Sequence, residues 1–327
     1  MKTPVSIKKR QQFDILLTLL MLFILPLYYY GLRILVMLLV ALLTAVISEL
    51  LYQLFFLRRK KFVFDNTSII TAMICTLLLS ASVPYWLVAI AVAFGLFVAK
   101  YPFGGTGKNI FNPAATGLCF VGLCWPDIVF VYPKPMTAVP VFSNEFVTSK
   151  SAEYQLQLGG LPELTPLQEL LGQYAGALGA TAALVIIACF VFLLARKDIS
   201  FYAPVAFIVT ASVFILIFPR VINARFDSLL PEMTVGLLLF GAVFMVTDPC
   251  TSPRTKLGGI YFGILLGILT ILFKHFGVND YNFLYALLFA NAMHAPCDRL
   301  AKKTGTIFLQ KLSTPLKSVG GGKNGKK

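Results

Sequence analysis

The sequence predicts an all-α, polytopic integral membrane protein with about ten transmembrane helices. Three observations lead to this fold class. Of the 327 residues 58% are apolar, the mean hydropathy is +0.81, and only 13% are charged, where soluble domains average about 25%. A soluble globule cannot hide that much apolar surface. The 28 Lys and Arg residues outnumber the 14 Asp and Glu, but they lie in short clusters between apolar runs, as membrane flanks do, so they do not indicate nucleic acid binding.

The apolar runs define the expected spans in order. A bilayer core about 30 Å thick needs roughly 20 apolar residues per helix, and fewer where a helix is broken. The first run follows a basic segment, as in a signal peptide, but no small-residue cleavage site follows, so we expect an uncleaved helix. The third to fifth runs are short and bounded by Pro or Gly. The ten expected spans are Phe13–Tyr30, Leu32–Phe56, Ser68–Ser82, Tyr85–Ala99, Ile110–Trp125, Tyr174–Ala195, Phe201–Phe218, Leu229–Val246, Leu257–Phe273 and Tyr281–Ala295.

The basic residues predict the orientation. When successive loops are assigned alternately to the two sides of the membrane, 22 of the 28 Lys and Arg residues fall on one side. The positive-inside rule then places both termini in the cytoplasm. We therefore expect a cytoplasmic N-terminus (1–12), a single membrane domain (13–299) and a flexible basic cytoplasmic tail (300–327) that lies against anionic headgroups. The other side receives six basic residues: Arg33, Lys134, Lys150, Arg220, Arg225 and Lys274.

One long loop, 126–172, falls on the extracytoplasmic side. It carries five acidic residues against two lysines, on a chain that is otherwise basic. Loops of this length inside a compact fold are usually functional or disordered.

Two short cytoplasmic segments, 100–115 and 246–256, combine Gly or Pro with Asn, Thr, Ser and Asp at the mouths of helices. Non-helical backbone at membrane depth survives only beside protein or a water-filled cavity, so such mouths tend to line sites. The alternative is simple helix capping, since Asn112-Pro113 and Ser252-Pro253 both read as an N-cap followed by Pro. The glycine-rich part of the first segment lacks the spacing of a phosphate-binding loop, so nucleotide hydrolysis is not indicated.

Few ionisable residues remain within or beside the spans, and these are candidates for function because such groups are costly in a membrane. Glu49 lies inside the second span, Asp65 and Asp248 lie at cytoplasmic mouths, and Glu232 lies near the outer end of the eighth. We expect Glu49 and Asp65 on an ion path; for Glu49, a purely structural polar partner is the alternative. The six cysteines form no C-x-x-C pair and have no paired His, so neither a zinc site nor an iron–sulfur site is expected.

Four motifs occur in order along the chain: Asp65-Asn-Thr-Ser-Ile-Ile-Thr, Gly-Gly-x-Gly-Lys-Asn-x-Phe-Asn-Pro-Ala-Ala, Thr247-Asp-Pro-Cys-Thr-Ser-Pro and the segment 291–298. Together they resemble the RnfD/NqrB family. This is the membrane subunit shared by the Rnf ferredoxin:NAD oxidoreductase, as its D subunit, and the sodium-pumping NADH:quinone oxidoreductase, as its B subunit. The similarity runs from about Phe13 to Asp298, and the chain length is closer to that of the Rnf D subunit.

The resemblance implies two flavins. One is FMN, joined through its phosphate to a Thr hydroxyl in an extracytoplasmic Asp-x-x-[Ser/Thr]-[Gly/Ser]-Ala-Thr motif; the other is a non-covalent riboflavin within the membrane fold. The matching segment, 145–151, has Glu for Asp, Lys150 for Ala and Ser151 for Thr. Ser151 keeps a hydroxyl and is the candidate for covalent FMN, whereas Thr148 would break the register. An unmodified loop that docks a partner is the alternative.

Candidate residues of a flavin pocket are Asn112, Thr247 and Asp248, at the two cytoplasmic mouths. A flavin passes electrons one or two at a time, while the protein supplies position and electronics. The chain has no nicotinamide-binding fingerprint and no cysteine pattern that binds an iron–sulfur cluster. We therefore expect it to have no catalytic residues and to act only as one subunit in a chain of electron carriers.

The implied function is that of a flavin-carrying, D-like subunit in a bacterial cytoplasmic membrane. It would pass electrons between ferredoxin- or NAD-linked partners, coupled to translocation of Na⁺ or H⁺. Its expected partners are the other membrane and peripheral subunits of an Rnf-like complex and membrane lipid. Two other functions remain open: a channel or transporter that has lost the covalent flavin, and a flavin anchor that feeds electrons to extracellular acceptors.

Overall fold

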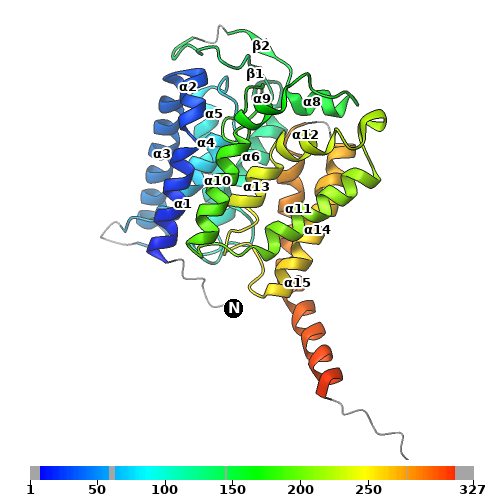
Figure 1. The fold of residues 1–327 in the computed structure, drawn as a ribbon. Coiled ribbons are helices and arrows are strands. Elements are labelled where there is room, and N and C mark those ends of the chain that lie inside the picture. Colours follow the sequence, from blue (N-terminus) through cyan, green and yellow to red (C-terminus); the bar gives the residue numbers. More distant parts are fainter. Residues whose placement is uncertain (1–7, 59–62, 144–145, 278, 314–327) are drawn as a thin grey trace, which may run out of the picture.

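The computed structural model describes residues 8–58, 63–143, 146–277 and 279–313, and their secondary structure is almost entirely helical. The helices stand side by side in one bundle, with two short strands and several short helices gathered at one end (Figure 1). We call this the strand end; it carries residues 126–143, 146–172, 219–234, 277 and 279–281. The opposite end carries residues 100–112 and 246–255, and we call it the motif end.

Within the described ranges, three helices are long and apolar enough to cross a membrane, by length and composition: Lys9–Tyr30, Arg33–Phe56 and Lys256–Phe276. Five further apolar helices are shorter, with 10 to 17 residues. The first half of the chain forms α1 (Lys9–Met21), α2 (Ile24–Tyr30), α3 (Arg33–Leu51), the π-helical turn η1 (Tyr52–Phe56), α4 (Asn66–Leu77), α5 (Tyr85–Phe94), the π-helical turn η2 (Gly95–Lys100), α6 (Pro113–Cys124), α7 (Pro126–Val129), β1 (Tyr132–Pro133) and β2 (Thr148–Ser149).

The second half begins with two short helices of the long loop and continues into the bundle. It forms α8 (Ala152–Gln157), α9 (Pro166–Leu171), α10 (Ala183–Ala195), α11 (Tyr202–Ile217), the 3₁₀ turn η3 (Ile222–Ala224), α12 (Leu229–Thr234), α13 (Leu238–Phe244), α14 (Lys256–Phe276) and α15 (Asn282–Ser313).

Local sequence explains where several helices begin. Asp65 accepts a hydrogen bond from the Thr67 N–H at the start of α4, and Thr255 accepts one from the Gly258 N–H at the start of α14. A side-chain oxygen in this position satisfies a backbone N–H that has no partner within the helix. Pro166 occupies the first turn of α9 behind a complete capping box, where its missing N–H costs nothing.

Glycines allow two helix pairs to pack with their backbones in contact. A Cβ on Gly117 would lie 1.9 Å from the Ala91 carbonyl oxygen, and one on Gly95 would lie 2.2 Å from that of Pro113, so α5 and α6 approach too closely for any side chain. On α14, a Cβ at Gly263 would meet the Ala203 carbonyl oxygen of α11 at 2.5 Å. Small residues at helix contacts are typical of membrane helices, whose association depends on close packing.

Each of the ten expected spans contains helix, but several are not helical throughout. The eighth breaks into α12 and α13 at residues 235–237, where Gly236 has φ +81°. In the sixth, residues 174–182 are non-helical and α10 begins only at Ala183. Apolar composition does not distinguish a continuous helix from a broken one, because a buried non-helical segment is just as apolar. The number of membrane crossings and the orientation of the termini stay predictions.

The long loop, 126–172, is held down by contacts with the first helices. The Arg33 guanidinium donates to the carbonyl oxygens of Pro140 (2.8 Å) and Ser143 (3.1 Å), and the Tyr85 hydroxyl donates to that of Val141 (2.6 Å). Strands β1 and β2 then pair antiparallel. These contacts fix the position of the segment that ends in Ser151.

The domain division also stays a prediction. Helix α15 continues past residue 299 to Ser313, so the start of the expected tail is helical. Several residues of the predicted topology lie outside the described part of the chain: residues 1–7, the basic residues at 59–61, Glu145 and residues 314–327.

Candidate functional site

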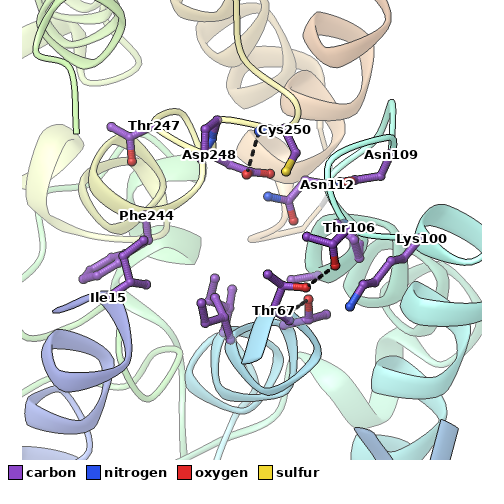
Figure 2. A pocket seen from close by; sticks show the side chains of 16 residues that line it. Ile15, Thr67, Lys100, Thr106, Asn109, Asn112, Phe244, Thr247, Asp248 and Cys250 are labelled. Carbon is purple, nitrogen blue, oxygen red and sulfur yellow. Dashed lines mark hydrogen bonds between the residues drawn. The ribbon is translucent and has the colours of Figure 1, made fainter. Parts of the chain in front are cut away.

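A cavity at the motif end brings together residues from five parts of the chain. Figure 2 shows Ile15 and Phe244 on one side of it, Lys100 and Thr106 on another, and the loop after α13 above. Asn112, Thr247 and Asp248, the three flavin-pocket candidates, all line this cavity. The complete lining is Ile15, Thr67, Ile70, Thr71, Ile74, Lys100, Thr106, Asn109, Asn112, Pro113, Ala114, Phe244, Thr247, Asp248, Pro249 and Cys250.

Asn112 positions the first motif loop. Its side-chain oxygen caps α6 by accepting from the Ala115 N–H (3.1 Å), while its own backbone N–H donates to the Asn291 side chain (3.0 Å). Asn291 also donates to the Thr251 carbonyl oxygen of the second motif loop (3.5 Å). Capping and site formation are therefore not alternatives here, because the capping residue also lines the cavity.

Asp248 organises the second motif loop. Its carboxylate accepts from the Cys250 N–H (3.1 Å) and from the Thr251 hydroxyl (2.9 Å), so the acid forms a local turn. Burial raises the pKa of Asp248 above its usual value, and these donors oppose the change. The Thr247 hydroxyl donates back to the Val243 carbonyl oxygen of α13 (2.5 Å).

Both ion-path candidates contact a single lysine. Lys100 Nζ lies 2.8 Å from Asp65 Oδ2 and 3.7 Å from Glu49 Oε2. It also donates to the Ser68 hydroxyl (2.6 Å), which in turn donates to Glu49 Oε2 (2.7 Å). Tyr101 donates to the same Glu49 oxygen (3.1 Å). We call Glu49, Asp65 and Lys100 the lysine cluster; it has two acids for one base.

Asp65 lies at the boundary between this cluster and the cavity. It accepts from the Lys100 ammonium and from the hydroxyls of Thr67 and Thr106. Burial alone would raise the pKa of Asp65, but the Lys100 charge and these hydrogen bonds outweigh it and hold the pKa below its usual value. Asp65 is therefore ionised at neutral pH.

The chemical groups that line the cavity suit a flavin, but the volume of the cavity is too small for one. Amide, hydroxyl and carboxylate groups converge from the two motif loops, opposite apolar walls of isoleucine and phenylalanine; this is the usual composition of a cofactor site. The cavity volume is about 80 Å³, below the roughly 300–1,000 Å³ of typical ligand sites. A bound isoalloxazine ring therefore requires the walls to move apart.

The strand end holds the two hydroxyls considered for covalent FMN. Ser151 is buried and caps α8, accepting from the Tyr154 N–H (3.0 Å). Thr148 is exposed on β2. Both line one open groove, of about 1,040 Å³, with Phe130, Tyr132 and Tyr154. Lys150 Nζ lies 5.4 Å from the centre of the Tyr154 ring.

The types of residue that line this groove suit an attached flavin phosphate. The groove is large enough for a drug-sized ligand, it presents aromatic rings and one cation, and two hydroxyls stand on its wall. However, the Ser151 hydroxyl is already used as a helix cap and also donates to Asp280. Esterification at Ser151 therefore requires the first turn of α8 to open, whereas Thr148 is accessible as it stands.

Behind this groove, four buried charges form a closed ring. Arg220 donates to Glu153 (2.8 Å) and to both oxygens of Glu232 (2.6 and 2.5 Å). Lys274 lies 3.2 Å from Glu153 and 3.1 Å from Glu232. All four side chains are at most 6% exposed. We call them the four-charge ring; it joins α8 of the long loop to α12 and α14.

Sequence reasoning missed several of these residues. Lys100 was counted only as a flanking charge, although it ends an apolar run and directly precedes a motif. Asn291 lay in a recognised motif but had no assigned role. For the four-charge ring, the signal was the small number of basic residues on the outer side, which includes Arg220 and Lys274. Within the described ranges, no group of three or more His, Cys, Asp and Glu side chains is placed to hold a metal ion.

Comparisons with known proteins identify the same family as the sequence motifs do. The model of the NQR2, RnfD, RnfE family matches residues 2–305. The D subunit of the ion-translocating oxidoreductase complex of Cronobacter sakazakii is 30% identical over 296 residues, covering 81% of this chain and 85% of that protein. The corresponding D subunit of Actinobacillus succinogenes is 28% identical, with coverages of 81% and 84%. The B subunit of the Na(+)-translocating NADH-quinone reductase of Chromohalobacter salexigens is 30% identical, with coverages of 68% and 55%.

Proposed function

The chain belongs to the NQR2, RnfD, RnfE family, and from this premise we propose that it is the flavin-carrying membrane subunit of an Rnf-type electron-transport complex. It is a membrane protein of the kind found in ion-translocating oxidoreductase complexes. The observation that carries the finer proposal is the cavity at the motif end, where the two motif loops converge on one space.

We propose that this cavity holds the non-covalent riboflavin. The flavin would supply one- and two-electron transfer. Asn112, Asn109 and Thr106 offer donors and acceptors along one wall, and Asp248 offers a carboxylate on the adjoining loop. The apolar side chains of Ile15 and Phe244 face them. These residues would exclude water from the ring and orient its polar edge.

The covalent FMN is assigned to Ser151, with Thr148 as the second acceptor. Both hydroxyls stand on the wall of the groove at the strand end. Lys150 brings a positive charge to the same wall, and this charge favours a phosphate. In this proposal the two flavins would lie at opposite ends of the bundle, as a path for electrons across a membrane requires.

For ion translocation, we propose that Glu49 and Asp65 lie on the ion path. Their carboxylates share Lys100, which lines the cavity, so a change of charge in the cavity would act on this cluster through Lys100. The motif end would face the cytoplasm of a multi-pass protein in the bacterial cytoplasmic membrane, with both termini inside. The other subunits of the complex, carrying ferredoxin- or NAD-linked centres, would be its partners, and the coupling ion would be Na⁺ or H⁺.

The test is a flavin inventory of the protein purified in mild detergent. After denaturing electrophoresis, in-gel fluorescence reports covalent flavin, and the mass of the loop peptide locates it; extraction of the native protein reports free riboflavin. Variants Ser151→Ala and Thr148→Ala decide between the two acceptors. If protein purified from a host that synthesises and attaches flavins contained neither kind, the proposal would be lost.

A transporter on the same scaffold is the second candidate, because α12–α13 and residues 174–182 are broken within the apolar bundle. Discontinuous helices of this kind form substrate sites in transporters. Solute flux in proteoliposomes without any redox partner would support it, and tight vesicles containing flavin-loaded protein would exclude it.

A further inference from the structure

Asp280 lies between two hollows at the strand end. It lines the open groove of about 1,040 Å³ and also a much smaller cavity of about 10 Å³. The smaller cavity is lined by Ser151 and Glu153, by residues 174–177 of the expected sixth span, and by the 235–237 break. Its volume is that of roughly one water molecule. Asp280 therefore borders both a large groove and a space for about one water molecule.

The charges around Asp280 leave this acid without a basic partner of its own. The ionisable groups that face it come from α8 (Glu153), α14 (Lys274) and β1 (Tyr132). Glu153 and Lys274 belong to the four-charge ring, which is complete with Arg220 and Glu232. Among the described residues, no ion pair joins Asp280 to a Lys or Arg. The ring is neutral in sum, so Asp280 adds one negative charge.

Local contacts at Asp280 act in opposite directions. Burial, and then the neighbouring Glu153 charge, raise the pKa of Asp280 to about 6, although the hydroxyls of Tyr132 and Ser151 donate to its carboxylate and favour the ionised form. Low-dielectric surroundings and a like charge are the two conditions under which a carboxyl keeps its proton at unusually high pH.

We propose that Asp280 is a proton-binding site of the strand end, which exchanges its proton with water in the open groove. The carboxylate takes a proton from a hydronium ion and leaves a water molecule; release is the reverse. Protonation removes the charge that the ring does not balance. The inference goes beyond the proposed function and does not require a flavin at Ser151, so each can fail without the other.

The experiment is infrared difference spectroscopy of the full chain, without attached flavin, in lipid nanodiscs. The carbonyl stretch of protonated carboxylic acids is followed between pH 4 and 8. Wild-type protein should show a band that disappears with a midpoint near pH 6. Asp280→Asn should lose this band. Asp127→Asn, which removes an exposed acid from the wall of the same groove, should keep it. A wild-type spectrum without the band, or a band that survives in Asp280→Asn, overturns the proposal.

A second variant guards against misfolding of the first. Ser151→Ala removes one donor to the carboxylate, and the midpoint of the Asp280 band should therefore shift upward. A merely structural role for Asp280 predicts no such shift. Each titration is repeated with sodium replaced by choline; a midpoint that moves with sodium would show a metal-cation site and contradict the assignment to a proton.

Discussion

The two buried charge clusters differ in balance and in access. At the motif end, two carboxylates share Lys100 beside a cavity, and Asp65 keeps 22% of its side chain exposed. At the strand end, two carboxylates and two cations close a ring in which every side chain is at most 6% exposed. In this ring the two negative charges are balanced by the two positive charges, so its role is to hold α8, α12 and α14 together. An unbalanced cluster at a cavity responds to any new charge that enters it.

Breaking the ring should have the largest effect. Arg220→Met leaves Glu153 and Glu232 with only Lys274, and removal of one partner from a buried ion pair costs about 3–5 kcal/mol. Denaturant unfolding in mild detergent measures the loss. The control is Arg225→Met, an exposed arginine in the same connection, which should change stability by less than about 0.5 kcal/mol. Equal effects of the two variants would mean that the ring does not hold the fold.

Breaking the lysine cluster should cost less. Lys100→Met leaves two acids without a cation, but Asp65 is 22% exposed and can be hydrated, so we expect a loss of about 2–3 kcal/mol. The double variant Lys100→Met/Glu49→Gln should recover part of this loss, because one of the two unpaired charges is then gone. Lys108→Met, at an exposed lysine of the same loop, is the control. Without any recovery in the double variant, Glu49 and Lys100 are not coupled.

The two ends should also respond to pH with opposite sign. The pKa of Asp65 is lowered, so its contribution to stability is present above its unfolded pKa of about 3.9 and is lost as the pH falls through the folded value. The pKa of Asp280 is raised to about 6, so the folded state binds this proton more tightly and stability falls as the pH rises from about 4 to about 6. Thermal unfolding across this range should lose that fall in Asp280→Asn and keep it in Asp127→Asn. A slope unchanged in Asp280→Asn would contradict this assignment.

The helix caps give the smallest effect and the sharpest separation. Asn112 caps α6 and Ser151 caps α8, and alanine at either position should cost about 1 kcal/mol. Flavin content then separates the two ends. Asn112→Ala should reduce extractable riboflavin, whereas Ser151→Ala should reduce covalent flavin. If both variants lose both flavins in proportion, the two ends do not carry separate sites.

Composition and hydropathy were enough to predict the helical class, because burial in a bilayer imposes apolar runs regardless of tertiary contacts. They did not show the break at Gly236. Gly236 has a positive φ, and a Cβ at this position would lie 3.1 Å from the Glu153 carboxylate. Such a break depends on a residue more than 80 positions earlier in the chain, and no local pattern records it.

The site was predicted in part, for a similar reason. Asn112, Thr247 and Asp248 were found because each lies in a motif at a helix mouth. Their convergence on one cavity depends on Asn291, and the partner of Glu49 and Asp65 depends on Lys100; both relations join segments distant in sequence. Covalent attachment at Ser151 stays a prediction, because the fold shows a capping role for this hydroxyl and also a groove beside it.

The amide of Asn291 has a mechanical consequence. It accepts a hydrogen bond from the Asn112 N–H and donates one to the Thr251 carbonyl oxygen. It thereby links two loops that are more than 130 positions apart in sequence. That side of the cavity is therefore tied together across the two loops. We expect any widening of the cavity around a bound molecule to come from the opposite side, where Ile15 of α1 and Phe244 of α13 form an apolar wall.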